Sequence, residues 1–333
     1  MLLHTINTQN QRKSQNLTEP PIENQWVGEV DAYQISAPVD RLKDILRSVN
    51  HLISFQYHPQ AYVTGFVNGA SVVTNASMHV CQPFIYNVDL KHFFDSIYAE
   101  MVIDRLRRPP YNYSLEVAEV IAKMSSIKDP NTGRIHLAQG APSSPIISNI
   151  ICESLDRDLF ALGNQFGVKY SRYADDITFS SSRNIYRYNG EFYRSLNKII
   201  ENHSFEINHD KVRIRGRQQR QEVTGLIVNQ KVNVSRAFIK DIRNLLYIWE
   251  KYGAQHAYWR FYSKCMKSKD FNLKNKYVPF FVDSLRGKLN YLALVKGIND
   301  PTYIKLNQKF ISLNKGNYKN FSNTSYSNTS LII

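Results

Sequence analysis

Apolar and polar residues recur with different periods along this chain, and each period predicts a different element. Past Pro38, apolar residues recur at helical spacing as far as Ile53, so an amphipathic helix is expected there after a strand-like opening at Asp31. The apolar positions of this helix are Leu42, Ile45, Leu46, Val49 and Ile53. Residues 84–90 form a short, mostly apolar run that indicates a strand, and residues 91–106 are expected to be helical.

Residues 168–180 predict a tight β-hairpin. Two runs rich in Tyr, Val, Ile, Thr and Phe flank the polar pair Asp175 and Asp176. Such residues favour strands, and Asp tolerates the conformations of the turn between them. Adjacent carboxylates repel, so a site that keeps both ionised usually contains a cation. The tip is therefore a candidate site, and an ordinary solvent-facing turn is the alternative.

The remaining periodic segments predict mostly helices. Residues 205–217 are an exception, because alternation there predicts one strand with a row of cations on one face: Lys211, Arg213, Arg215 and Arg217. Such a row suits a phosphate backbone, and a solvated edge strand is the alternative. Val223–Asn229 predicts another short strand with a glycine break. Helices are expected at 115–124, 193–203, 235–252 and 278–296, with one long helix from Ser144 to Leu162 that ends at Gly163 or Gly167.

Composition indicates what kind of partner the protein binds and argues against several other classes of protein. The 333 residues carry a formal net charge of +14, which favours nucleic acid as a polyanionic partner over a membrane. The three cysteines show no Cys-x-x-Cys spacing, which argues against a zinc site or disulfides and suits a reducing cytosol. No apolar run approaches the roughly 18 residues of a membrane span. Residues 1–19 lack the features of a signal peptide.

Three further polar residues are candidates for a role. Asp89 lies near the end of the strand predicted at 84–90, where a charge is costly unless it is paired or binds a metal. Because a second acidic segment exists, we interpret Asp89 as a metal ligand rather than an incidental strand-end carboxylate. Asn75 and His79 are four residues apart, which would place them on one helical face. A hydrogen-bonded structural pair is the default interpretation for them.

Three motifs in this order resemble the successive palm motifs of reverse transcriptases. They are Val88-Asp-Leu-Lys-His-Phe-Phe94, Gln139-Gly-Ala-Pro-Ser-Ser-Pro145 and Tyr173-Ala-Asp-Asp176. Lys211 stands where that family has a later palm lysine, and Val223–Asn229 is similar to its primer-contacting strand pair. The resemblance covers roughly residues 30–312.

Two signatures resemble bacterial retron reverse transcriptases in particular. They are Asn75-Ala-Ser-Met-His79 and Val223-Thr-Gly225. One position departs from the pattern, because Tyr33-Gln34 stands where relatives usually carry a basic residue that helps to hold the incoming triphosphate. We assign no substitute for that residue.

The resemblance implies an α+β, right-hand polymerase fold with fingers, a palm made of an antiparallel sheet and helices, and a helical thumb. The expected division is an N-terminal arm (1–30), fingers (31–85, with an excursion at 109–137), a palm (86–229), a thumb (230–313) and a disordered tail (314–333).

The resemblance also implies roles for individual residues in a reaction assisted by two Mg²⁺ ions. Asp89 and Asp175 would bridge the ions, and Asp176 would be a weaker ligand nearby. Phe94 would exclude the 2′-hydroxyl of a nucleotide, or is simply core, because only one of Phe93 and Phe94 can face the substrate. Gln139 and Gly140 would brace nucleotide and template, and Lys211 would protonate the pyrophosphate or merely bind backbone. Retron RNA recognition or a framework role is expected for Asn75, His79, Val223, Thr224 and Gly225.

The function implied is that of a bacterial, cytoplasmic RNA-directed DNA polymerase that uses dNTPs. It would copy part of its own structured noncoding RNA into branched multicopy single-stranded DNA (msDNA), primed by the 2′-hydroxyl of an internal guanosine. The ribonucleoprotein would act with an accessory toxin or effector in antiphage defence. The alternatives are a group II intron-like or diversity-generating reverse transcriptase, or mainly a nucleic-acid-binding scaffold that restrains an effector.

Overall fold

The computed structural model describes residues 38–130, 132–267 and 280–321, which form two compact units. Unit 1 holds the described residues up to Met78 together with Gln82–Arg217. Unit 2 holds His79–Cys81 and the described residues from Gln218 onward. The expected arm at 1–30, the strand-like opening and Tyr33-Gln34 lie outside the described residues.

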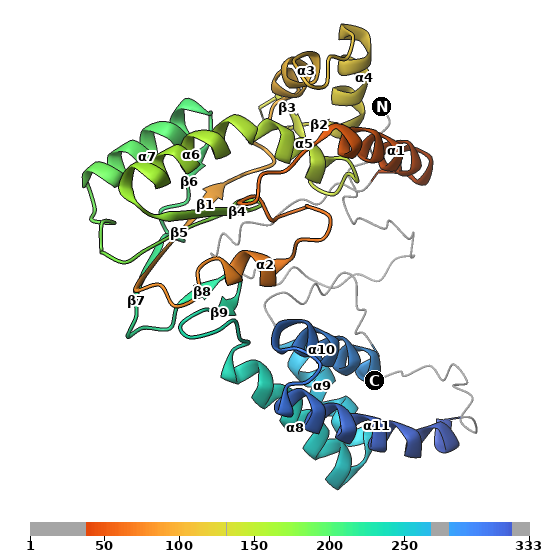
Figure 1. The fold of residues 1–333 in the computed structure, drawn as a ribbon. Coiled ribbons are helices and arrows are strands. Elements are labelled where there is room, and N and C mark those ends of the chain that lie inside the picture. Colours follow the sequence, from red (N-terminus) through yellow and green to blue (C-terminus); the bar gives the residue numbers. More distant parts are fainter. Residues whose placement is uncertain (1–37, 131, 268–279, 322–333) are drawn as a thin grey trace, which may run out of the picture. The chain divides into compact units, whose positions relative to one another are not determined.

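A five-stranded antiparallel sheet forms the centre of unit 1 (Figure 1). Its middle strand is β1 (Phe84–Lys91), which pairs on one side with β5 (Asp176–Ser181), and β5 pairs in turn with β4 (Lys169–Tyr173). On its other side, β1 pairs with both β6 (Glu206–Ile207) and β7 (Arg213–Gly216). Most residues of β1, β4 and β5 are buried, as their apolar and β-branched composition predicts.

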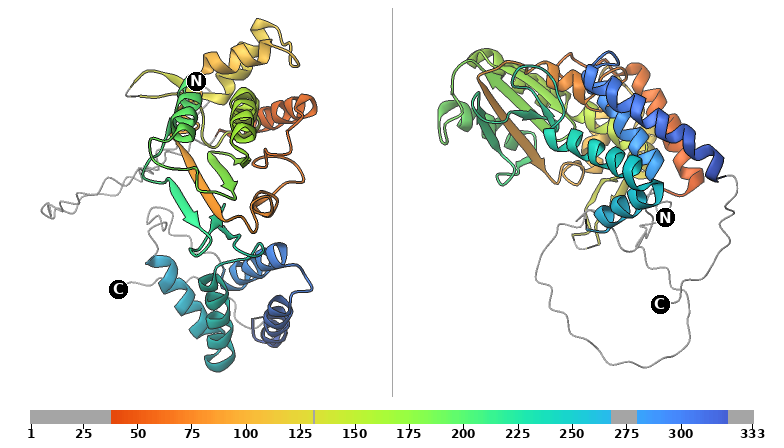
Figure 2. Two further views of the ribbon diagram at one scale, coloured as in Figure 1. Left: turned by 60° about the vertical axis from the view of Figure 1, so that its left-hand side comes forward. Right: turned by 90° about the horizontal axis from the view of Figure 1, so that it is seen from below.

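Helices α6 (Glu153–Phe166) and α7 (Glu191–Asn202) lie side by side over one face of the sheet (Figures 1 and 2). The long helix expected from Ser144 is in fact two helices, because α5 (Ser144–Ile151) ends one residue before α6 begins. The residue between them, Cys152, has a ψ angle of −2° instead of the roughly −42° of a regular helix. Gly167 caps α6 in the left-handed conformation, at the second of the two ends predicted from the sequence.

The other elements of unit 1 surround this core. They are α1 (Asp40–Gln56), α2 (Val72–Ser77), α4 (Leu115–Ser125) and a hairpin of β2 (Ser126–Lys128) with β3 (Ile135–Leu137). The helical spacing predicted for α1 is confirmed, since Leu42, Leu46, Val49 and Ile53 are buried, although Ile45 is exposed.

Helix α3 (Ala99–Arg107) begins later than the sequence suggests. Residues 92–96 form turns instead of the first helical turns expected after Lys91. His92 has a φ angle of +48°, which a helix does not allow, and Phe93 is buried in the core. Burial of Phe93 therefore prevails over the helical spacing of this segment.

The strand expected over residues 205–217 is interrupted. It forms β6 and β7, and Lys211 lies in the turn that connects them. The prediction of a single row that includes Lys211 is therefore wrong. The turn forms because Lys211 N bonds Asn208 O, while Asn208 N bonds Asp89 O of the neighbouring strand.

Unit 2 consists of a two-stranded hairpin and four described helices (Figure 2). Strands β8 (Glu222–Val223) and β9 (Leu226–Ile227) pair across Thr224-Gly225, so the expected glycine break is a hairpin turn. The helices are α8 (Arg236–Tyr252), α9 (Ala254–Met266), α10 (Phe281–Lys296) and α11 (Pro301–Phe321). The Trp249 ring lies 5.3 Å from the ring of Phe281 and 6.0 Å from that of Phe310.

Two boundaries differ from the expected division. Helix α11 continues to Phe321, so the chain is helical where a disordered tail was expected from residue 314; buried Leu306 and Phe310 anchor the start of this helix. Residues 322–333 lie outside the described part. The β8–β9 hairpin belongs to unit 2, whereas the predicted palm extends to residue 229. Among the described helices, none has the length and apolar character needed to cross a membrane.

Candidate active site

Strand pairing in unit 1 brings the three candidate acidic residues to one end of the sheet. In the antiparallel register of β1 and β5, Asp89 is directly opposite Asp176. The backbone N–H of Leu90 donates to the carbonyl of Asp175 over 3.1 Å, which ties the hairpin tip to the end of β1. Asp89 and Asp175, which are 86 positions apart in the sequence, therefore lie at the same end of the sheet, as the resemblance to the palm motifs predicts.

The tip itself is a tight turn with an unusual backbone. Ala174 has a φ angle of +57°, a left-handed conformation that costs a residue with a Cβ roughly 1 kcal/mol or more. β4 ends at Tyr173 and β5 begins at Asp176, so Ala174 and Asp175 alone make the connection. The predicted hairpin with both carboxylates at its tip is thus present.

Among the described ion pairs, one joins a lysine, Lys211, to the acidic residue Asp89. Its ammonium lies 3.1 Å from Oδ1 and 3.3 Å from Oδ2 of Asp89. The Asp89 side chain is only 11% exposed, while that of Lys211 is 50% exposed. Lys211 reaches Asp89 because it lies in the turn between β6 and β7. A continuous strand over residues 205–217 did not predict this contact.

Electrostatics at the tip disfavour full ionisation. Loss of hydration, together with the charges of Asp175 and Asp89, raises the pKa of Asp176 to about 6. Loss of hydration and the Asp89 charge also raise the pKa of Asp175, against the opposing effects of a backbone hydrogen bond, Lys211 and Arg172. These carboxylates are therefore stabilised less by the protein than ordinary paired carboxylates, and an added cation would stabilise their ionised forms.

The donor set matches a hard divalent cation, which binds carboxylate oxygens. In the described part of the chain, however, no three Asp, Glu, His or Cys side chains are arranged so that they could jointly hold a metal ion. Both oxygens of Asp89 contact Lys211 instead. Asp89 would therefore have to exchange the ammonium for a metal before it could act as a ligand.

The candidate substrate residues lie on nearby segments of unit 1. Phe93 is buried and stacks on Phe205 with ring centroids 5.7 Å apart, whereas Phe94 is only partly buried and lies 6.4 Å from the exposed ring of Phe66. Of the two adjacent rings, Phe94 is thus the one that is available to a substrate. Gln139 is half-buried and Gly140 is exposed. The φ angle of Gly140, +117°, is one that only glycine adopts without strain.

Several residues of the two retron-like signatures are buried. Asn75 accepts a hydrogen bond of 2.6 Å from the hydroxyl of Ser171, and both Asn75 and His79 are fully buried. Helix α2 ends at Ser77, so the prediction that Asn75 and His79 share a helical face is wrong. In the second signature, Val223 is buried, while Thr224 and Gly225 have φ angles of +46° and +77° in the β8–β9 turn. Burial and turn geometry favour the framework alternative for these positions.

Sequence reasoning missed a buried ion pair beside the hairpin tip. Arg172 of β4 and Asp156 of α6 are both buried and lie 2.6 Å apart. A signal was present, because Asp156 interrupts the apolar stripe formed by Leu155, Leu159 and Leu162. A single carboxylate within such a stripe indicates a buried partner.

Comparison with known proteins identifies the family to which this chain belongs. Residues 34–228, more than half of the chain, match the family described as "Reverse transcriptase (RNA-dependent DNA polymerase)". The matched region contains every candidate catalytic and substrate-binding residue named above.

Curated relatives are retron enzymes. The chain is 31% identical over 232 residues to the Retron Mx65 reverse transcriptase of Myxococcus xanthus, covering 64% of this chain and 52% of the relative. It is 32% identical over 215 residues to the Retron Ec86 reverse transcriptase of Escherichia coli, covering 63% and 62%. With the Retron Mx162 reverse transcriptase of Myxococcus xanthus it shares 34% identity over 218 residues, covering 59% and 44%. The aligned part thus spans about half the length of these relatives.

Proposed function

The chain belongs to the reverse transcriptase family, and from this premise we propose that it is a retron reverse transcriptase that copies part of its own structured noncoding RNA into branched msDNA. The observation that carries the proposal is the juxtaposition of Asp89 with Asp175 and Asp176 inside the matched region. The curated relatives support the retron assignment, since those compared are retron reverse transcriptases.

Family membership and the helix-flanked antiparallel sheet confirm the predicted fold class, the α+β fold of a right-hand polymerase. Within it we assign fingers to residues 31–85 with the excursion at 109–137, a palm to 86–229 and a thumb to 230–313. The division into two compact units after Arg217 supports a separate C-terminal helical part.

The family is one of divalent-metal-dependent polymerases. When bound, two Mg²⁺ ions would lower the pKa of the primer hydroxyl and neutralise charge on the leaving pyrophosphate. Asp89 and Asp175 would hold them, and Asp176, whose pKa is about 6, would be the weaker ligand. Lys211, whose ammonium contacts both carboxylate oxygens of Asp89, would donate a proton to the pyrophosphate.

Around the acidic site, Gln139 and Gly140 would brace nucleotide and template. Partial exposure of Phe94 supports its assignment as the ring that excludes a 2′-hydroxyl. We therefore expect Phe94→Ala to raise incorporation of rNTPs relative to dNTPs, measured as the ratio of kcat/KM values. Phe93→Leu, a change in the core, is the control and should leave that ratio unchanged.

The proposed partners are the cognate noncoding RNA, its msDNA, dNTPs and an accessory toxin or effector, within an antiphage ribonucleoprotein in the bacterial cytoplasm. Priming would use the 2′-hydroxyl of an internal guanosine. The net charge of +14 supports a nucleic-acid partner. Burial of Asn75 and His79 leaves RNA contact to other residues, so these two positions would act by supporting the fold.

The test combines Asp175→Ala with Asp176→Ala in the full chain co-expressed with its noncoding RNA. We expect msDNA to disappear while binding of the RNA, measured by co-purification, persists. A charge-matched control replaces Asp44 and Asp104, two exposed carboxylates, and should leave msDNA intact. If the double variant at the tip still produced msDNA, the acidic site would not be the polymerase centre. If RNA binding alone sufficed for the biological effect, the scaffold alternative would be favoured.

A further inference from the structure

Arg172, in strand β4, is completely buried although it carries a permanent charge. Only Tyr173 separates it from Ala174 at the hairpin tip. Burial of a guanidinium costs several kcal/mol unless a counterion and hydrogen-bond acceptors surround it. The acceptors around Arg172 therefore show what this charge holds in place.

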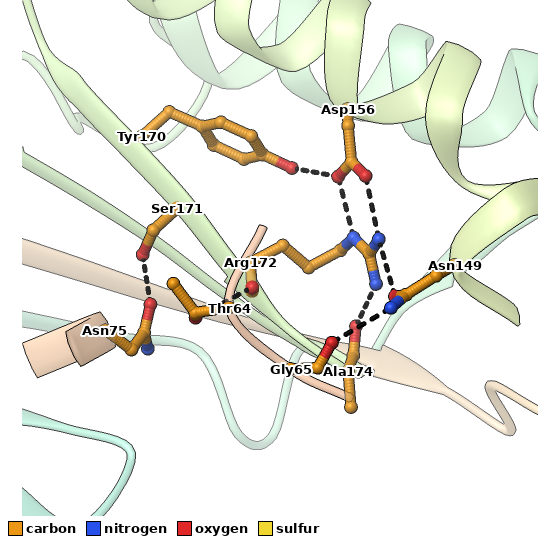
Figure 3. A network of polar contacts seen from close by, with 9 residues as sticks. All are labelled: Thr64, Gly65, Asn75, Asn149, Asp156, Tyr170, Ser171, Arg172 and Ala174. Carbon is orange, nitrogen blue, oxygen red and sulfur yellow. Dashed lines mark hydrogen bonds and ion pairs between the residues drawn. The ribbon is translucent and has the colours of Figure 1, made fainter. Parts of the chain in front are cut away.

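The counterion is Asp156 of helix α6, which is 2% exposed (Figure 3). Arg172 Nε donates to Oδ1 over 2.6 Å, and Nη2 donates to Oδ2 over 2.7 Å. This two-point geometry fixes the plane of the guanidinium as well as its position. The hydroxyl of Tyr170 donates a further 2.6 Å hydrogen bond to Asp156 Oδ1, which holds the carboxylate itself.

The remaining side of the guanidinium faces the hairpin tip. Nη1 donates to the carbonyl oxygen of Ala174 over 3.0 Å, and Nη2 also donates to Asn149 Oδ1 over 3.2 Å. Asn149 in turn donates through Nδ2 to the carbonyl of Gly65 over 2.9 Å. One buried side chain thus connects helices α5 and α6 to the tip and to the loop that contains Gly65 (Figure 3).

The Ala174 carbonyl belongs to the peptide group that enters Asp175. Arg172 therefore fixes the orientation of the plane from which Asp175 projects. On the other side of the same residue, the Asp175 carbonyl accepts a hydrogen bond from Leu90 N, in the strand that carries Asp89. Because Ala174 is in the left-handed region, this conformation persists only where surrounding contacts enforce it.

Gly65 closes the opposite side of the tip. A Cβ atom at Gly65 would lie 2.3 Å from Ala174 N and 2.9 Å from the carbonyl carbon of Tyr173. Both neighbours are backbone atoms, so any side chain at this position would displace the tip. The loop is tied to β4 by hydrogen bonds of 2.9 Å from Thr64 N to Arg172 O and from Arg172 N to Tyr62 O.

We propose that the buried Arg172–Asp156 pair and the close approach of Gly65 set the position of the Ala174–Asp175 peptide, and thereby the affinity of the acidic site for divalent cations. Arg172, Asp156 and Gly65 are positioning residues, because none of them needs to touch metal or substrate. The inference rests on the proposed function of the acidic site.

The decisive variant removes the positioning contact without leaving a buried charge. Asp156→Leu, Tyr170→Phe and Arg172→Met are combined, since well-packed apolar residues often replace a buried ion pair at no loss of stability. The full chain, freed of nucleic acid, is titrated with Mn²⁺ by electron paramagnetic resonance. We expect Mn²⁺ affinity to fall by roughly ten- to a hundredfold, as for other residues that support metal ligands. Far-UV circular dichroism should remain that of the wild type.

A second variant acts from the other side and leaves the ion pair intact. Gly65→Ala should weaken Mn²⁺ binding in the same direction by displacing Ala174, so the inference stays testable if the triple variant fails to fold. Ser171→Ala is the matched control. It removes a buried 2.6 Å hydrogen bond from the same strand without touching the tip, and should leave Mn²⁺ affinity unchanged.

The outcomes separate the two proposals. Wild-type Mn²⁺ affinity in the folded triple variant, or in folded Gly65→Ala, overturns the positioning role, and so does an equal loss in Ser171→Ala. Asp175→Asn serves as the reference for the acidic site itself. If Asp175→Asn alone binds Mn²⁺ like the wild type, the metal assignment under the proposed function fails. If Asp175→Asn is defective and the supporting variants are not, only the positioning role fails.

Discussion

Unit 1 contains two kinds of carboxylate, and their surroundings differ in opposite ways. Asp156 is buried and accepts three hydrogen bonds from Arg172 and Tyr170. Asp175 and Asp176 share the end of the sheet with Asp89, and the proximity of like charges contributes to raised pKa values for both. Among the described contacts, the half-exposed Lys211 is paired with Asp89.

This contrast separates a carboxylate that stabilises the fold from carboxylates that await a cation. The lone pairs of Asp156 are used by the protein, so it has little to offer a ligand. The acids at the sheet end instead carry a cost that the folded chain bears without a ligand, which is typical of functional sites. Substitution of Asp156 and substitution of Asp176 should therefore change the stability in opposite directions.

The largest expected effect follows from removing Asp156. Asp156→Ala would leave the buried guanidinium without a counterion, and the free energy of unfolding should fall by about 3–5 kcal/mol. Urea denaturation followed by circular dichroism measures this. Asp158→Ala on the same helix removes the half-exposed partner of His203 and should cost less than about 1 kcal/mol. An equal loss of unfolding free energy in Asp156→Ala and Asp158→Ala would show that Asp156 is no more important for stability than an exposed carboxylate.

Asp89→Asn should act on catalysis instead. It preserves shape and removes a charge, so primer extension is expected to drop by more than about a hundredfold, since loss of a residue that merely supports a ligand already costs roughly ten- to a hundredfold. The thermal midpoint should change little. Asp210→Asn makes the same replacement at an exposed carboxylate in the nearby turn and should extend primers normally. A stable, fully active Asp89→Asn variant would remove Asp89 from the site.

Asp176→Asn should stabilise the metal-free protein, with a definite pH dependence. The pKa of Asp176 is near 3.8 in a free peptide and about 6 in the fold, so the native state binds more protons between those values. The stability contributed by this group is therefore complete below pH about 4 and is lost as the pH rises through 6. At pH 7 the variant should melt at a higher temperature than the wild type. The difference should be only a few degrees, because solvent screens part of the effect.

Melting curves in EDTA at pH 4, 5, 6 and 7 check that dependence. The two midpoints should converge at the acidic end, where the wild-type carboxyl is protonated and resembles the amide. A constant difference at every pH would mean that the variant acts through packing rather than through charge.

The smallest effect is expected for Lys211→Met. The Lys211–Asp89 pair has the same charges as the buried Arg172–Asp156 pair, but the lysine is half-exposed. Its loss should change the free energy of unfolding by less than about 1 kcal/mol. Denaturation by urea provides the comparison with Asp156→Ala, and a loss of several kcal/mol would show that the lysine has a structural role after all.

Much of this architecture could be predicted from local patterns. The hairpin around Asp175 and the helix after Pro38 follow from apolar periodicity and turn chemistry, which act over a few residues. The convergence of Asp89 with that hairpin was anticipated through the resemblance of three ordered motifs, because strand register over 86 residues is not encoded in local spacing.

The parts that escaped prediction depend on long-range contacts. Nothing near Arg172 distinguishes it from an exposed strand arginine, since its counterion comes from a helix 16 residues earlier. The helix expected after Lys91 starts late because Phe93 packs against Phe205, more than a hundred residues away. The division between β6 and β7 likewise follows from the bond between Asn208 and Asp89.

That division has a mechanical corollary. Residues 208–212 connect two short strands, β6 and β7, that pair with opposite ends of β1. Both ends of this connecting segment are therefore held by the same strand. The length of this segment decides whether the ammonium of Lys211 reaches the carboxylate of Asp89. Removing or adding one residue in this segment would therefore alter the contact between Lys211 and Asp89 without changing Asp89, Asp175 or Asp176 themselves.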